Sequence, residues 1–152
     1  MPPFPASQPM ARALAEARAA ATRGEVPIGA VIYAADGTEL AAAGNRTLEL
    51  RDPTAHAEIL AIRAACTAIG SERLVGCTLH VTLEPCPMCA SAIAQARIAT
   101  LVYGASDPKS GGVETGPRLF THPQCHHVPQ VISGIAEVES AAMLRSFFAA
   151  RR

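Results

Sequence analysis

The order of helical and extended segments constrains the fold of this chain more than any other feature of the sequence. Segments with apolar residues at helical spacing alternate with short segments whose apolar residues indicate strands. We predict helices over residues 7–23, 55–70, 87–98 and 137–152, and strands over residues 28–34, 38–44, 78–84, 99–105 and 128–134. This alternation predicts the α/β class, with one sheet covered by helices on both faces.

Short-range signals mark several element boundaries. Asp36-Gly37 lies between the first two strands, and this dipeptide accepts the left-handed conformation that a tight hairpin needs. Thr54 follows Asp52-Pro53 and can cap the free amides of the second helix. Pro87 suits the first position of the third helix. We therefore expect a hairpin near the N-terminus and two helices that begin close to residues 55 and 87.

Length and composition exclude several classes of protein. The 152 residues are the size of one ordinary domain, so we predict a single domain over residues 1–152, with about residues 1–6 disordered. Basic and acidic residues balance, 13 against 13, so RNA binding would need local basic patches. No signal peptide and no long apolar segment is evident, which predicts a cytoplasmic protein without a membrane partner. Five cysteines, an odd number, favour metal binding over a disulfide framework.

Three possible metal ligands lie at the starts of two predicted helices. Cys86 and Cys89 form a C-x-x-C pair where the positive helix end favours thiolates. A structural zinc site would need four protein ligands, and the sequence has no second C-x-x-C pair. His56 is the remaining candidate ligand. Three protein ligands leave the fourth position for water, which is the pattern of a catalytic zinc site.

Glu58 lies two residues after His56 and suits a general base better than a ligand. Residues two apart on a regular helix diverge by about 200 degrees, so both side chains reach one ion only past the helix end. Zinc lowers the pKa of a bound water to roughly 7, and a neighbouring carboxylate can take that proton and return it to a leaving group.

Other interpretations of these residues remain open. The C-x-x-C pair could be a redox pair, and a single histidine at a helix start could be structural. A noncatalytic, zinc-stabilised binding module would make Glu58 dispensable, and zinc removal would then destroy folding. Cys125–His127 is not expected to form a second metal site, because adjacent residues rarely converge on one ion. The combination of H-x-E with P-C-x-x-C favours the catalytic site, because it is a signature of zinc nucleobase deaminases.

The chain resembles the cytidine deaminase superfamily and, within it, the bacterial tRNA-specific adenosine deaminases. The resemblance is carried by the segments EVPIGAV, GNR, AHAEI, VTLEPCPMCASAI, YGASDPKSGG and SAAMLRSFF, which span nearly the whole sequence. It implies a three-layer α/β/α cytidine-deaminase-like fold with a central five-stranded mixed sheet. It also implies a homodimer that converts the wobble adenosine of an arginine tRNA anticodon stem-loop to inosine.

The resemblance assigns roles to individual residues. His56, Cys86 and Cys89 would bind one Zn²⁺ per subunit, and Glu58 would protonate N1 of adenine during hydrolysis at C6, which releases ammonia. The residues implied in substrate binding are Asn45, Ala57, Glu84, Pro85, Asp107 and Lys109. Asn45 would bind the flipped nucleotide, backbone groups near Ala57 and Glu84 would bracket the reacting atoms, and Asp107 would contact a neighbouring sugar.

Each of these assignments has a simpler alternative. Asn45 and Asp107 could be ordinary turn residues. Lys109 and Arg118 could meet phosphates or carry solvated loop charges. We expect Phe147 and Phe148 to pack the last helix, although one aromatic ring could also contact RNA.

A different function is also compatible with the zinc site. A metabolic deaminase of a free base or nucleoside, such as guanine or cytosine, would use the same zinc and Glu58 but would lack an RNA surface. The neutral net charge favours this alternative. The loop over residues 106–112 and the C-terminal helix favour the RNA substrate.

Overall fold

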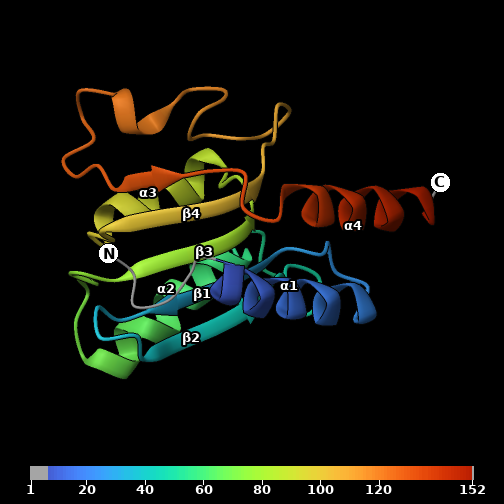
Figure 1. The fold of residues 1–152 in the computed structure, drawn as a ribbon, viewed down its shortest axis with the longest axis horizontal. Coiled ribbons are helices and arrows are strands. Elements are labelled where there is room, and N and C mark those ends of the chain that lie inside the picture. The colour runs from blue at the N-terminus through green and yellow to red at the C-terminus, as the bar shows by residue number, and fades with distance from the viewer. Residues whose placement is uncertain (1–6, 152) are drawn as a thin grey trace.

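The computed structural model describes residues 7–151, which form a five-stranded sheet in the order β2-β1-β3-β4-β5. The strands are β1 (Gly29–Tyr33), β2 (Glu39–Gly44), β3 (Thr78–Leu83), β4 (Thr100–Ala105) and β5 (Gln130–Ile132). β1 pairs antiparallel with β2 and β3, whereas β3, β4 and β5 run parallel. The predicted mixed sheet is confirmed (Figure 1).

Helices cover both faces of this sheet (Figure 1). They are α1 (Ser7–Thr22), α2 (Ala57–Ile69), α3 (Pro87–Gln95) and α4 (Glu137–Ala149), with a short 3₁₀ helix, η1 (Leu119–Thr121). Leu79 and Val81 of β3 pack in the core with α2 and α3. Val31 and Val102 pack in a second core with α1 and α4. Because alternate strand residues serve opposite faces, the structure has the three layers of the α/β/α prediction.

A close approach fixes α1 on the sheet. A Cβ atom built at Gly29 would lie 1.9 Å from the carbonyl oxygen of Ala13 and 2.6 Å from the backbone nitrogen of Ala17. Any side chain at this position would therefore push α1 away from β1. The small side chains of α1 and the absence of a side chain at Gly29 thus allow the backbones of α1 and β1 to pack directly.

Two predicted boundary details are confirmed and one is wrong. Gly37 adopts the left-handed conformation at φ 93° in the β1–β2 hairpin, and Pro87 is the first residue of α3. Thr54 does not cap α2. Its N–H and hydroxyl donate to Asp52 Oδ1 at 2.9 and 2.7 Å, forming a separate turn, and the N-cap residue is His56. The helix therefore begins two residues later than Thr54 would allow.

The C-terminal helix also differs in part from its prediction. α4 ends at Ala149, and Figure 1 shows that it extends past the ends of the strands. Phe147 is buried, as expected of a packing residue. The side chain of Val138, in the first turn, is 79 % exposed. The predicted disorder of residues 1–6 lies outside the described residues.

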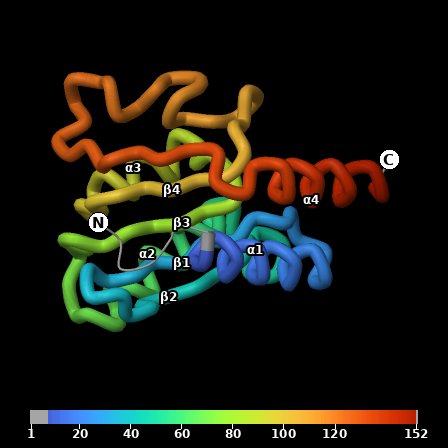
Figure 2. Tube along the Cα trace, viewed as in Figure 1, coloured from blue at the N-terminus to red at the C-terminus, as the bar shows by residue number. Residues whose placement is uncertain are grey.

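A long connection over residues 106–129 joins β4 to β5 and contains η1 (Figure 2). It is tied to the start of α3, because the N–H of Gly112 donates to the carbonyl oxygen of Pro85 at 2.8 Å. The first part of this connection therefore lies where the C-terminal end of β3 leads into α3. No helix within residues 7–151 has the length and apolar character needed to cross a membrane.

Candidate active site

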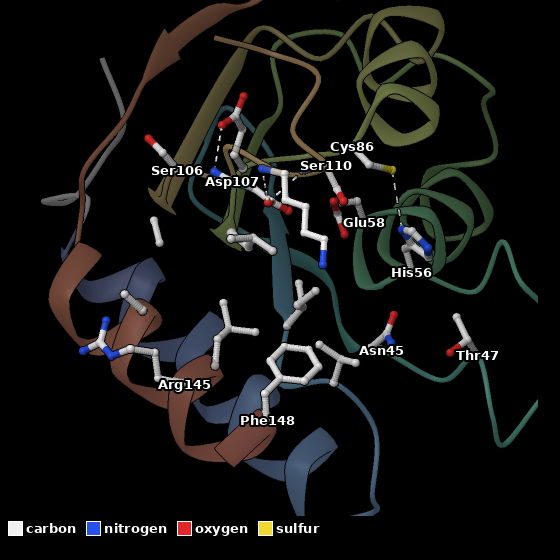
Figure 3. A pocket seen from close by; sticks show the side chains of 18 of the residues that line it. Asn45, Thr47, His56, Glu58, Cys86, Ser106, Asp107, Ser110, Arg145 and Phe148 are labelled. Carbon is white, nitrogen blue, oxygen red and sulfur yellow. Dashed lines mark hydrogen bonds between the residues drawn. The ribbon is translucent and has the colours of Figure 1, made fainter. Parts of the chain in front are cut away.

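A cavity of about 920 Å³ opens where the starts of α2 and α3 face α4 and the loop after β4 (Figure 3). Seven of the ten residues predicted for the site line this cavity, namely Asn45, His56, Glu58, Glu84, Cys86, Asp107 and Lys109. These residues come from four separate segments of the chain. The fold therefore brings the predicted metal ligands and most of the predicted substrate-binding residues to one place.

The three candidate metal ligands converge at two helix N-termini. His56 is the N-cap residue of α2, Cys86 is the N-cap residue of α3, and Cys89 lies in the first turn of α3. Their extended backbone conformations, with ψ of 154° at His56 and 171° at Cys86, leave both N-cap side chains outside the helical spiral. The helix ends also direct partial positive charge at the thiols, which favours their ionised forms.

The distances between these ligand atoms suit a tetrahedral zinc ion. His56 Nδ1 lies 3.7 Å from Cys86 Sγ and 3.5 Å from Cys89 Sγ. Bonds of about 2.05 Å to nitrogen and about 2.3 Å to sulfur, at a tetrahedral angle, would separate nitrogen and sulfur by about 3.6 Å. Within residues 7–151, this is the one group of three such side chains whose ligand atoms lie within 4.8 Å of one another. The chemistry and the spacing of the donors both fit zinc.

The two thiols of this cluster differ in acidity. Hydrogen bonds from Cys89 and from His56 lower the pKa of the Cys86 thiol below its usual range, despite its partial burial. The hydrogen bond to Cys86 and burial raise the pKa of the Cys89 thiol. One thiolate is therefore stabilised by the protein alone, and a divalent cation would favour ionisation of both sulfurs.

Glu58 lies beside this cluster in the first turn of α2 and faces the cavity (Figure 3). Its side chain is only 4 % exposed, and burial raises the pKa of its carboxyl group. A raised pKa makes a carboxylate a stronger base than an exposed carboxylate, which favours proton transfer from a nearby water. Position and environment therefore suit Glu58 to acid–base chemistry.

The predicted substrate-binding residues fall into two groups. Asn45 is buried, its backbone is bonded to Ile28 and to the Arg23 side chain, and its own side chain faces the cavity (Figure 3). Glu84, Asp107 and Lys109 also line the cavity. Ala57 and Pro85 are buried and lie behind the cavity wall, so only their backbone groups could approach a substrate. Substrate contact at all six positions stays a prediction.

The Glu84 side chain has a role that the sequence did not suggest. Burial alone would raise its pKa, but N–H donors from Asp107, Glu114 and Thr115 outweigh burial and lower it. The Asp107 carboxylate is used within the same loop, since Oδ1 accepts hydrogen bonds from the N–H groups of Lys109 and Ser110 at 3.2 and 3.0 Å. The loop after β4 is therefore an ordered wall of the cavity.

The outer rim of the cavity carries cations and one exposed aromatic ring. Lys109, Arg145 and Arg151 line the rim, and no ion pair within the described residues involves them. Phe148 also lines it and is 46 % exposed, although its ring packs edge-to-face on the Phe147 ring with centroids 5.4 Å apart, so the prediction that it packs the helix is confirmed only in part. Arg118 lies on the exposed part of the connection and does not line the cavity.

Sequence reasoning missed Arg145 as a cavity residue and left open whether Phe147 or Phe148 would face a substrate. The positions of apolar and charged residues along α4 do not indicate which side of the helix meets the sheet. The only sequence signal for Arg145 and Phe148 was the resemblance of the segment SAAMLRSFF.

An α/β/α fold with a three-ligand cluster and a buried carboxylate at one cavity is the arrangement of a metal-dependent hydrolytic deaminase. Comparison with known proteins agrees. A family model described as "Cytidine and deoxycytidylate deaminase zinc-binding region" matches residues 5–105. A protein of Agrobacterium fabrum named "tRNA-specific adenosine deaminase" is 61 % identical over 143 residues, covering 94 % of this chain and 93 % of the relative.

Solved structures place the chain in the same family. A structure from work on A-to-I editing by tRNA:A34 deaminases at the wobble position of transfer RNA is 60 % identical, with a TM-score of 0.89. The match covers 91 % of this chain and 99 % of that one. Guanine deaminase from Bacillus subtilis is more distant, at 32 % identity and a TM-score of 0.67 over 97 % of this chain and 94 % of its own. The chain belongs to the cytidine deaminase family and, within it, to the tRNA-specific adenosine deaminases.

Proposed function

We propose that this chain is a zinc-dependent deaminase that converts the wobble adenosine of tRNA to inosine, with arginine tRNA as its substrate. The observation that carries this proposal is the cavity itself. It combines a three-ligand cluster and the buried Glu58 at its base with Lys109, Arg145 and Arg151 at its rim. The base of the cavity suits hydrolysis at a ring carbon, and the rim suits a substrate with phosphates on both sides of the reacting base.

The proposed chemistry uses one ion and one carboxylate in a single domain over residues 1–152. His56, Cys86 and Cys89 would hold one Zn²⁺ per subunit, which supplies an acidified water beside Glu58. Glu58 accepts a proton from that water and delivers it to N1 of the adenine while oxygen adds to C6. Glu58 then transfers the second proton of the water, from the oxygen now on C6, to the amino group. The amino group leaves as ammonia, and C6 becomes the carbonyl carbon of hypoxanthine.

The proposed substrate contacts lie around this centre. Asn45 hydrogen-bonds the flipped nucleotide, and backbone groups near Ala57, Glu84 and Pro85 bracket the reacting atoms. Asp107 accepts a hydrogen bond from the 2′-hydroxyl of a neighbouring nucleotide, which favours RNA over DNA. Lys109 lies on the same loop and contacts a phosphate. An anticodon loop suits this cavity because its unpaired bases can leave the stack at modest cost.

We also propose that two copies of the chain form the active protein, in the cytoplasm. A groove of about 610 Å³ lies between α2 and α3, with Ile59, Ile62 and Met88 among its lining residues. Arg63 and Glu72 line it as well, so opposite charges could pair across a two-fold axis. Sedimentation analysis should give a dimer, and Ile62→Glu should give a monomer; a monomeric wild-type protein would contradict this proposal.

Inosine formation by zinc-loaded protein tests the function directly. The substrates are an arginine-tRNA anticodon stem-loop with a wobble adenosine and, separately, free adenine, guanine, cytosine and their nucleosides. Editing of the stem-loop, lost in Glu58→Gln, supports the proposal. Turnover of a free base with none on RNA would instead assign the chain to nucleobase metabolism, as the likeness to a guanine deaminase allows.

A further inference from the structure

A buried carboxylate that takes no part in the proton transfers holds one wall of the cavity. Glu84 follows β3, and its side chain is 2 % exposed. Its Oε1 accepts a hydrogen bond from the N–H of Asp107 at 3.0 Å. Its Oε2 accepts hydrogen bonds from the N–H groups of Val113, Glu114 and Thr115 at 3.1, 2.9 and 3.0 Å. The Thr115 hydroxyl adds a fifth, at 3.0 Å, so five donors of one loop converge on this side chain.

This loop, residues 107–115, is seated directly on the segment that carries the cysteine ligands. A Cβ atom built at Gly111 would lie 2.6 Å from Glu84 Cδ and 2.2 Å from Thr115 Oγ1. One built at Gly112 would lie 2.6 Å from the Pro87 nitrogen. The two glycines are therefore required by the close approach of the loop to Glu84 and to the start of α3.

The loop presents the side chains that meet the substrate in the proposed function. The N–H of Asp107 is bonded to Glu84, and the carboxylate of Asp107 in turn accepts from the N–H groups of Lys109 and Ser110. Asp107, Lys109 and Ser110 all line the cavity (Figure 3). Glu84 therefore positions these side chains indirectly. It accepts a hydrogen bond from the Asp107 N–H, and the Asp107 carboxylate fixes the turn that follows.

We propose that Glu84 is a positioning residue, whose carboxylate fixes the 107–115 loop and so sets where the nucleotides flanking the reacting base are held. This inference rests on the proposed action on RNA. Its side chain acts through the loop and not on the reacting atoms. Loss of the carboxylate should therefore weaken the binding of a polynucleotide more than it slows turnover.

Glu84→Gln is the variant that tests this role. Glutamine keeps the size of the side chain but replaces an acceptor oxygen by an NH₂ group, which faces N–H donors. The loop keeps a second anchor, because the Tyr103 hydroxyl donates to the Glu114 carboxylate. The variant should therefore loosen the loop without unfolding the sheet. On the stem-loop substrate, we expect KM to rise at least tenfold and kcat to fall less than threefold.

A double-mutant cycle separates positioning from general stabilisation. Asp107→Asn should add little to Glu84→Gln, because the loop that presents Asp107 is already displaced. The matched control is Glu25→Gln. Glu25 is another buried glutamate, and it accepts hydrogen bonds from the N–H groups of Leu48 and Glu49 at 3.2 and 2.9 Å in a different loop. In that background Asp107→Asn should keep its full effect. Additive effects with Glu84→Gln, or a fall in kcat at unchanged KM, would overturn the proposal.

Amide hydrogen exchange of the zinc-loaded protein gives a second measurement that does not depend on editing. In Glu84→Gln, the amides of residues 113–115 should exchange at least tenfold faster, while those of β3 should not change. Unchanged exchange at residues 113–115 would contradict the proposal even if the enzyme edits tRNA. Failure of the wild type to edit RNA would remove the proposed function but leave this result interpretable. If Glu84→Gln does not fold, Gly111→Ala replaces it, because its Cβ displaces the same loop.

Discussion

The two walls of the cavity are built in different ways. On the metal wall, His56 and Cys86 are N-cap residues of α2 and α3, and Cys89 lies one turn further along α3. On the opposite rim, Lys109 comes from a loop that is held by hydrogen bonds, and Arg145 comes from α4. The metal wall depends on local helix geometry, whereas the rim depends on contacts between segments far apart in the sequence.

This difference suggests that the metal wall carries out the reaction and that the rim selects the substrate. A solved structure named as a guanine deaminase shares the fold at 32 % identity, so proteins of this fold are named for more than one substrate. Arg145 and Phe148 of the rim lie across the cavity from His56 and Cys86 (Figure 3). We therefore expect changes in the metal wall to abolish turnover of any substrate, and changes in the rim to affect only a polynucleotide.

Metal removal should have the largest effect. Chelation of the zinc-loaded protein should abolish inosine formation, because the acidified water is lost. The sheet should remain folded, since the second core contains no residue of α2 or α3 and the first core extends along both helices beyond their first turns. Circular dichroism and activity, followed together during chelation and zinc readdition, check this. Cooperative unfolding on chelation would instead favour a zinc-stabilised binding module.

Glu58→Gln should have the next largest effect within the metal wall. The change removes the proton carrier but keeps its size, so single-turnover inosine formation should fall by about 10²- to 10⁴-fold. Bound zinc should stay at the wild-type level, because Glu58 is not one of the three clustered ligands. The matched control is Glu139→Gln, at an exposed glutamate of α4 that does not line the cavity. A loss of zinc in proportion to activity would make Glu58 a ligand and would remove its proposed role.

The metal wall and the main elements were predictable because their signals are local. Helix and strand periodicities predicted four helices and five strands, and the H-x-E and P-C-x-x-C patterns indicated three candidate ligands that the structure brings together at two helix starts. Thr54 was the local error. Its hydroxyl was taken as a cap, but Asp52 lies two residues before it and binds it first. His56 is consequently the N-cap residue of α2, and from this position its side chain can reach the two cysteines of the cluster.

The rim was predictable only in part: the resemblance named Asp107 and Lys109, but long-range contacts decide how the rim is built. The donors to the Glu84 carboxylate lie 23 to 31 residues further along the chain, and nothing near Glu84 indicates them. Helical spacing allowed either Phe147 or Phe148 to face the core. Packing of α4 against the sheet placed Phe147 inside and left Phe148 at the cavity. Such choices depend on the docking angle of an element, which periodicity does not contain.

Asp107→Asn should produce the larger of two effects at the rim. Asparagine keeps an Oδ1 acceptor for the N–H groups of Lys109 and Ser110, so the turn is preserved. The substitution removes the charged acceptor of the proposed hydrogen bond from a 2′-hydroxyl. A loss of about 1.5 kcal/mol in this hydrogen bond lowers kcat/KM on RNA by about tenfold. Activity on a matched DNA stem-loop should change less, so the preference for RNA narrows. An equal loss on both stem-loops would contradict the sugar contact.

Neutralising one rim cation should have the smallest effect, and it distinguishes phosphate binding from a merely solvated charge. Each phosphate contact to a single strand contributes about 0.7 to the slope of log affinity against log salt. Lys109→Ala and Arg145→Ala should each lower that slope by about 0.7. The ratio of wild-type to variant affinity should then fall by about threefold between 50 and 200 mM salt. Binding of a labelled stem-loop at several salt concentrations measures this, with Arg73→Ala, at an exposed arginine outside the cavity, as the matched control. A slope equal to that of wild type in both rim variants would show that neither cation meets a phosphate. The rim would then bind RNA through Asp107, Arg151 and the exposed ring of Phe148.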